Sequence, residues 1–189
     1  MRVRLHSSVV LSLLSAVHTV AAQAGPSPEP VHRLRPSAFP RLPIAIRDDL
    51  ERRHCLVPQP YDARSPANVA HGAFTAPNIS EWAILCSVQD TSEILIYRMP
   101  SSEDARVVDS LERAADLGWV QDIGDNRRGF SRLIRALPRV RVPTWRRDDH
   151  GRVVPQPFDH DAIEQSFIGK ASEAFYHAAG RWYRRATTD

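Results

Sequence analysis

Two apolar segments joined by a short polar turn constrain the fold of this chain most strongly. The segments EWAILCSV (81–88) and SEILIYRM (92–99) are rich in isoleucine, leucine and aromatic side chains, which favour β-strands. The polar residues from Gln89 to Ser92 join them at hairpin length. The sequence therefore predicts a mostly antiparallel sheet, with strands near 69–74, 82–88, 92–98, 119–123, 129–136, 173–178 and 181–186.

Helical spacing of apolar side chains adds short helices to this sheet. Apolar residues four apart among charged neighbours predict a helix over 45–53. A second helix is predicted over 159–168, with an aspartate placed to cap its start and three apolar side chains on one face (Ile163, Phe167 and Ile168). The same spacing, although more weakly, predicts a third helix over 103–116. The expected fold class is α+β, with two or three short helices packed on the sheet and one disulfide.

The first 24 residues have the features of a secretory signal peptide. Two arginines precede an apolar run (9–22) that closes on Ala22-Gln23-Ala24, a small-x-small cleavage pattern. Cleavage there would leave Gly25 as the new N-terminus. The alternatives are an uncleaved anchor and a surface helix. The run is too short and too interrupted for a good membrane span, and no other segment could span a bilayer.

The rest of the chain divides into two parts. Residues 25–43 are rich in proline, which disfavours helix, and we expect a tether or extended arm there. Residues 44–189 are expected to form a single α+β domain, which is long enough to bury a core.

The two cysteines of the chain give information about its cellular compartment. An exported protein meets an oxidising environment, so Cys55 and Cys86 are predicted to form one disulfide. The bridge would tie the end of the helix over 45–53 to the strand over 82–88. Two buried free thiols or a catalytic thiol are the alternatives. The signal segment and the bridge together predict a periplasmic or secreted protein.

The positive charge of the chain comes from arginine, since Lys170 is the only lysine. This bias is typical of a GC-rich genome, and we expect a bacterial source. The formal charge is only +3, and no dense basic run alternates with aromatic residues, so nucleic acid is not expected as a partner. The arginines gathered between 127 and 147 fit an anionic envelope surface or an acidic partner, or else form a solvated face.

The stretch 72–86 has the outline of a calcium-binding loop followed by a strand. Its pattern would place ligands at alternate positions, namely Ala73, Thr75, Pro77 and Glu81. Only two of these residues carry side-chain oxygens, whereas calcium needs six or more oxygen ligands. We therefore expect that the loop is kept as a turn, stiffened by Pro77 and Asn78, and that it holds no metal.

This stretch resembles a degenerate FG-GAP unit, a family in which G-D-F leads into an Asp/Gly-rich calcium loop and then an apolar strand. Here Gly72 and Phe74 precede the loop, and Trp82 begins the apolar run. The C-terminal segment, DAIEQSF…KASEAFYHAAGRWYRRATTD, is similar to the endings of small exported bacterial proteins of unknown function. The resemblance implies an exported, β-rich domain and no characterised activity.

Apart from the thiol alternative, the catalytic candidates are histidines that could pair with a carboxylate. His160 lies between two aspartates and could act as a base or ligand, with Asp161 as a partner, although helix capping explains the aspartates more simply. His71 precedes Gly72 and could pair with a carboxylate. No metal-ligand spacing, nucleophile elbow or phosphate loop is present in the sequence, so neither a metal nor a cofactor is expected.

Two hypotheses of function follow. The favoured one is a small exported, non-catalytic binding or interaction module whose partner is an envelope or extracellular protein or glycan; exposed tryptophans and tyrosines are candidates for its binding face. The alternative is a small exported hydrolase whose site is assembled by the fold. That hypothesis requires His71 or His160 to lie within hydrogen-bond reach of a carboxylate inside a concave pocket.

Overall fold

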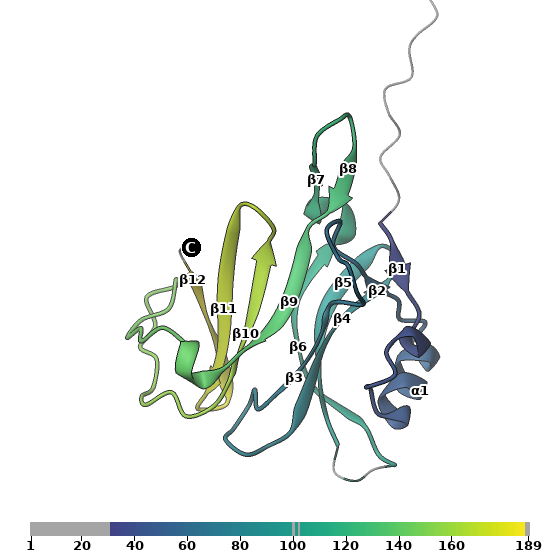
Figure 1. Cartoon of the computed structure of the whole chain (residues 1–189). Helices are drawn as coiled ribbons and strands as arrows, with labels where there is room; N and C mark the ends of the chain where they lie inside the picture. The colour runs from purple at the N-terminus through teal and green to yellow at the C-terminus, as the bar shows by residue number, and fades with distance from the viewer. Residues whose placement is uncertain (1–30, 100, 102, 188–189) are drawn as a thin grey trace, which may run out of the picture.

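Pairing between strands that are consecutive in the chain builds two four-stranded antiparallel sheets. The computed structural model describes residues 31–99, 101 and 103–187. The first sheet has the order β3-β4-β5-β6, so it is a simple meander (Figure 1). Its strands are β3 (Val69–Gly72), β4 (Glu81–Val88), β5 (Thr91–Arg98) and β6 (Arg106–Ala115). The hairpin predicted from the two apolar segments is β4 and β5.

The second sheet repeats this arrangement with the order β12-β11-β10-β9. Its strands are β9 (Arg132–Leu137), β10 (Ala162–Phe167), β11 (Ala171–Ala178) and β12 (Arg181–Thr187). Two smaller antiparallel pairs complete the described sheets: β1 (Arg33–Leu34) with β2 (Val57–Pro58), and β7 (Val120–Asp122) with β8 (Arg128–Phe130). The β7–β8 hairpin projects beyond the two larger sheets (Figure 1).

The main core lies between the two large sheets. Alternate side chains of β4 and β5 meet those of β9, β10 and β11 in one buried apolar cluster, which includes Leu85, Ile94, Ile134, Ile163 and Phe175. Alternation fits this arrangement, because every second side chain of a strand points to the same face.

Polar contacts join the two sheets along both sides. On one side, the carboxamide oxygen of Asn68, just before β3, accepts a hydrogen bond from the backbone N–H of Ile134 on β9 at 2.8 Å. On the other side, the indole of Trp182 on β12 donates to Asp109 on β6 at 2.7 Å. The two meanders therefore enclose the core between them.

A fully buried arginine crosses between the sheets. From β9, the Arg132 guanidinium donates to the backbone oxygens of Ser92 (3.2 Å) and Glu112 (2.6 Å) and to the side chain of Gln165 (2.7 Å). It also lies 4.8 Å from the ring centroid of Trp119. Burial lowers the pKa of Arg132 to about 10, and nearby carboxylates partly oppose this shift. These hydrogen bonds satisfy a charge that would otherwise be costly to bury.

The outer face of the first sheet is covered by α1 (Ile44–Arg52) and the segment before it (Figure 1). Ile46 and Leu50 of α1 pack with Ile84 and Tyr97 of the sheet in a second apolar cluster. Cys55 and Cys86 form a disulfide beside this cluster, with a Cα–Cα distance of 5.4 Å. The predicted bridge and the helix predicted over 45–53 are both confirmed.

The α+β assignment is wrong, because the described residues form mostly antiparallel sheet with one α-helix and three short 3-10 helices. These are η1 (Pro36–Ala38), η2 (Asp116–Trp119) and η3 (Arg139–Arg141). The helix predicted over 159–168 is strand β10, and the helix predicted over 103–116 is strand β6. In β10 two polar side chains are buried and hydrogen-bonded: Gln165 to Arg132, and Ser166 to Ser172.

The expected tether also differs from what is observed over its described part, residues 31–43. Val31, Phe39 and Leu42 are buried, and the last two belong to the cluster beneath α1. This part therefore packs on the sheet as part of the folded unit. The predicted signal peptide, residues 1–24, lies outside the described residues. Within the described ranges, no helix is long and apolar enough to cross a membrane.

Candidate functional site

Two neighbouring hollows lie on either side of the loop that follows β2. The first encloses about 380 Å³ and the second about 580 Å³, both in the range of ligand-binding pockets. Ser65 and Pro66 of the loop line both hollows, so the hollows adjoin one another. We call the pair the arginine cleft, after the four arginines that line it: Arg64, Arg127 and Arg128 in the first hollow and Arg41 in the second.

A single buried side chain closes the base of this loop. The carboxamide oxygen of Gln59 accepts a hydrogen bond from the backbone N–H of Ala67 at 2.8 Å, and its nitrogen donates back to the Ala67 carbonyl at 3.2 Å. The backbone N–H of Gln59 also donates to the His32 carbonyl at 2.8 Å. These hydrogen bonds therefore hold both ends of the loop formed by residues 60–66.

Close packing against β8 positions Tyr61 at the first hollow. The Tyr61 backbone N–H donates to the Phe130 carbonyl at 2.8 Å. A Cβ atom added to Gly129 would lie 2.4 Å from the Tyr61 Cβ, far inside van der Waals contact. Glycine at position 129 therefore allows the loop to approach the β7–β8 hairpin. Tyr61 as a whole remains 42% exposed, and so is accessible to a ligand.

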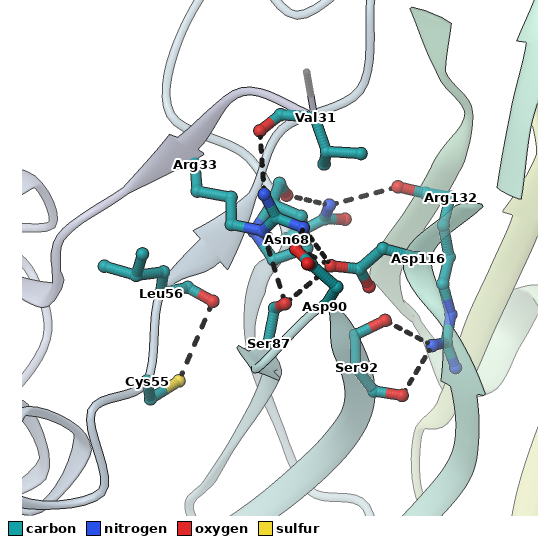
Figure 2. Close-up of polar contacts among 11 residues, drawn as sticks. Val31, Arg33, Cys55, Leu56, Asn68, Ser87, Asp90, Ser92, Asp116 and Arg132 are labelled. Carbon is teal, nitrogen blue, oxygen red and sulfur yellow. Dashed lines mark hydrogen bonds and ion pairs between the residues drawn. The ribbon is translucent and has the colours of Figure 1, made fainter. Parts of the chain in front are cut away.

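Strand β1 contributes to the first hollow and is anchored by the Arg33 side chain (Figure 2). The Arg33 guanidinium donates to the fully buried carboxylate of Asp116 at 2.7 Å and to Asp90 at 2.6 Å. The Ser87 hydroxyl donates to the same Asp116 oxygen at 2.5 Å. The residues on either side, His32 and Leu34, line the hollow. The buried ion pair therefore fixes one wall of the site.

The second hollow lies between the segment before α1 and the end of the first sheet. His71 on β3 and Trp82 on β4 are cross-strand partners, and their ring centroids are 4.5 Å apart. The His71 Nε2 atom is hydrogen-bonded to the Ser80 hydroxyl at 2.7 Å. Phe39 and Leu42 complete the apolar side of this hollow, and Arg41 lies on its rim.

The charge of the cleft has one sign. Among residues 31–99, 101 and 103–187, no aspartate or glutamate lines either hollow. The side chains of all four arginines are exposed, and within the described part of the chain none forms a hydrogen bond or an ion pair. In contrast, Arg33, Arg98 and Arg152 each pair with a buried carboxylate. The cleft therefore presents guanidinium groups that are free to bind an anion.

The histidine candidates occupy different surroundings. His71, at the second hollow, has a hydroxyl partner and no carboxylate partner among the described residues. His160 lies beside a third hollow of about 370 Å³, where its Nδ1 is 2.6 Å from the carboxylate of Asp159 and 3.2 Å from the Tyr176 hydroxyl. The fold therefore brings His160 to the preceding aspartate. Hydrogen bonding to His160 lowers the pKa of Asp159.

Asp161, the carboxylate expected to assist His160, binds backbone N–H groups instead. Its two oxygens accept hydrogen bonds from the backbone N–H groups of Ala73 (3.1 Å) and Arg139 (3.0 Å). Asp161 therefore fixes the chain before β10 to the loop after β3. The helix cap predicted for this aspartate is wrong, because no helix begins there.

The Nε2 atom of His160 is enclosed. It is buried and has no hydrogen-bond partner among the described residues. In an aspartate–histidine pair that acts as a general base, this nitrogen must reach the proton that it removes. The ring instead stacks on Tyr176, with centroids 4.4 Å apart. His160 and Asp159 thus form a hydrogen-bonded pair, but the nitrogen that would act as the base is not accessible to a substrate.

In the loop that resembles a calcium-binding loop, the one carboxylate is bound by hydrogen-bond donors of the protein. The Glu81 carboxylate, which is fully buried, accepts hydrogen bonds from the backbone N–H of Thr75 (2.8 Å) and its hydroxyl (2.6 Å), and from Arg98 (2.8 Å). The position that would close a calcium site therefore holds the loop to β5. Asn78 adopts a positive φ of 62°, which turns the chain within this loop.

Sequence reasoning missed the arginine cleft. Of the locally basic stretch 127–147, only Arg127 and Arg128 line it. Arg41 comes from the segment predicted as a tether, and Arg64 from the stretch between the helix predicted over 45–53 and the strand predicted near 69–74. The one available signal was the lack of a nearby acidic residue around Arg41, because its neighbours from 38 to 46 are uncharged.

Comparison with known proteins adds no relative. The chain matches no protein-family model, and neither a curated protein nor a solved structure is significantly similar to it.

Proposed function

We propose that this protein is an exported, non-catalytic binding module for an anionic ligand of the cell envelope or extracellular space. The observation that carries the proposal is the arginine cleft, in which four exposed arginines, and no carboxylate among the described residues, line two adjoining hollows. One exposed ion pair contributes little in water, because the charges are well solvated. Several guanidinium groups that converge on one concave surface add to one another and favour a polyanion.

Export rests on two supports. The first 24 residues have the sequence of a cleavable signal peptide. The Cys55–Cys86 disulfide is of a kind that persists in oxidising compartments. Expression of the full gene in a bacterial host, followed by intact-mass analysis of the periplasm and medium, tests export. We expect a chain that begins at Gly25; uncleaved protein that remains with the cytosol would contradict export.

The hydrolase alternative has one favourable observation. His160 meets the requirement of a histidine bonded to a carboxylate beside a hollow. The enclosed Nε2 atom weighs against it, because a base must contact the group that it deprotonates. We therefore favour the binding module.

The binding proposal is tested on dextran sulfate, a polyanion, with neutral dextran as the reference matrix. Protein purified from the periplasm or medium is expected to be retained on dextran sulfate only. Replacement of all four cleft arginines by glutamine should shift elution to much lower salt, because fewer counterions are released on binding.

A matched variant controls for net charge. It replaces four exposed arginines outside the cleft by glutamine, namely Arg139, Arg141, Arg146 and Arg181. Both variants lose the same formal charge, so only the position of the lost charges differs. Retention of the control like the wild type supports the proposal. An equal loss of retention in both variants would contradict it, because net charge would then explain the binding.

A further inference from the structure

We propose that the anionic ligand of the arginine cleft is an acidic polysaccharide, bound as an extended chain across both hollows. This inference rests on the proposed function and names its ligand class. An acidic polysaccharide combines carboxylate or sulfate groups with pyranose rings, whose C–H faces are apolar and whose edges carry hydroxyls. A site for such a chain needs cations, aromatic faces and polar side chains in alternation, and the cleft has all three.

Each hollow contains one aromatic side chain that is at least partly accessible to solvent. Tyr61 is 42% exposed in the first hollow, and its backbone is fixed by contact with β8. Trp82 is half-buried in the second hollow, and His71 holds its ring in place from the neighbouring strand. Aromatic rings of this kind are apolar on their faces and polar at one end, so they suit ligands with the same two characters.

Each aromatic side chain has cationic neighbours. The first hollow combines Tyr61 with Arg64, Arg127 and Arg128, and the second combines Trp82 with Arg41. Ser65 and Pro66 lie between them and line both hollows. A linear polymer that crosses Ser65 would meet an aromatic face and at least one guanidinium on each side. This repetition fits a polymer of similar units better than a single small anion.

The cleft offers little to the backbone of an acidic peptide. Three of its lining residues are prolines, Pro40, Pro60 and Pro66, which have no N–H to donate. The carboxamide of Gln59 is fully used within the loop. Peptides that bind as an added strand need a free row of backbone donors and acceptors.

The strand beside the second hollow does not supply such a row. β3 is the terminal strand of its sheet, but its flanks are joined to the second sheet. Asn68 accepts from the backbone of Ile134 before the strand, and Ala73 exchanges hydrogen bonds with Asp161 after it, at 2.8 and 3.1 Å. A peptide therefore cannot extend this sheet without first separating the two meanders, which makes a glycan the better-fitting polymer.

The test compares two polyanions, polygalacturonate and poly-L-glutamate, by isothermal titration calorimetry at equal concentrations of carboxylate and salt. The wild-type protein is expected to bind polygalacturonate more tightly. Replacement Tyr61→Ala should reduce this preference about fivefold, since the aromatic face contributes only where a sugar ring can lie on it. Tyr61→Phe, which keeps the ring, should restore the preference. Val140→Ala, at a side chain that is 87% exposed outside the cleft, is the control and should leave the preference unchanged.

The outcomes separate this inference from the proposed function. Equal affinity for the two polymers, or a preference that survives Tyr61→Ala, would overturn the polysaccharide while leaving anion binding intact. Binding to neither polymer would overturn both. Thermal unfolding of each variant is measured beside the titrations, so that a loss of folded protein is recognised. If Tyr61→Ala does not fold, the inference is judged on Tyr61→Phe, which should keep the preference of the wild type.

Discussion

The carboxamide oxygen of Gln59 accepts a hydrogen bond from the Ala67 backbone N–H at 2.8 Å, and the carboxamide nitrogen donates one to the Ala67 carbonyl at 3.2 Å. A side chain bound to a backbone group in this way acts like one rung of a sheet. Because the two residues stand at the ends of the loop that divides the arginine cleft, the shape of the cleft depends on this contact.

Gln59→Leu is expected to lower the free energy of unfolding by about 1–3 kcal/mol, because both Ala67 backbone groups lose a partner in a partly buried setting. It should also weaken retention on dextran sulfate, since residues 60–66 lose one fixed end. Urea unfolding and salt elution measure the two effects. Gln121→Leu, which removes a single side-chain bond to Ile168 outside the loop, is the control. Unchanged retention in Gln59→Leu would show that the loop is held by other contacts.

Gly129→Ala is expected to displace Tyr61, because the new methyl group would lie 2.4 Å from the Tyr61 Cβ. The clash should cost about 1–3 kcal/mol of stability, as overpacking generally does. Gly118→Ala is the matched control, because an added Cβ there meets nothing within 4 Å. Stability is measured by urea unfolding. If the two variants are equally stable, the close approach of the loop to β8 is refuted.

A double-mutant cycle localises this effect. Tyr61→Gly removes the Cβ atom that Gly129→Ala would strike, so the two changes together should destabilise less than the sum of the single changes. Strict additivity would place the strain elsewhere, for example against the Ile123 side chain, which is 3.1 Å from the added atom.

Removal of the disulfide is expected to lower stability by about 3–4 kcal/mol in the chain-entropy account, given the 31-residue separation of Cys55 and Cys86. The double variant Cys55→Ser/Cys86→Ser avoids an unpaired thiol. Urea unfolding of the oxidised wild type, the reduced wild type and the double variant should place the last two together and well below the first. Coincident curves for all three would contradict a stabilising bridge.

The Asp49 carboxylate is expected to make stability depend on acid. Burial alone would raise the pKa of Asp49, but hydrogen bonds from Tyr97 and Arg53 outweigh it and hold the pKa below its usual value. A carboxyl whose folded pKa is lowered contributes stability above its unfolded pKa of about 3.9, and this contribution is lost as the pH falls through the folded value. Asp49→Asn should therefore be less stable than the wild type at neutral pH.

Urea unfolding at neutral pH and at about pH 3 tests this expectation. The difference in stability between wild type and Asp49→Asn should shrink in acid. Asp48→Asn, at the exposed neighbouring position, serves as the control and should differ little from the wild type at either pH. A constant difference for Asp49→Asn across the range would contradict the lowered pKa.

The strands were predictable where alternation and turns agreed. The helix over 45–53 was predicted correctly, but the helices over 103–116 and 159–168 were wrong because helix and strand share one residue spacing. Side chains four residues apart share one face of a helix, but they also share one face of a strand, because four is a multiple of two. Ile163 and Phe167 on β10 show this spacing in a strand. In β6 a register shift separates Val107 from Leu111, and the two side chains pack in different apolar clusters. The prediction of a helix over 159–168 rested on this spacing and on an aspartate placed to cap its start. In the structure Gln165 is buried because Arg132 bonds to it, and a single sequence cannot reveal that partner.

The candidate site was less predictable than the fold. Cys55 and Cys86 were paired correctly, since only one pairing of two cysteines exists. The cleft joins the segment before α1, the loop after β2 and the β7–β8 hairpin, which lie far apart in the chain. Their meeting depends on contacts such as Arg33 with Asp116, and nothing in the local sequence signals these.

Nuclear magnetic resonance of the arginine side chains tests the central claim most directly. Each guanidinium Nε–H group gives its own signal, so titration of the labelled protein with dextran sulfate locates the bound anion. We predict that the largest shifts arise from Arg41, Arg64, Arg127 and Arg128, and that the four substituted cleft positions abolish the response. Larger shifts at Arg139, Arg141, Arg146 and Arg147 would place anion binding on the exposed surface outside the cleft and contradict the account.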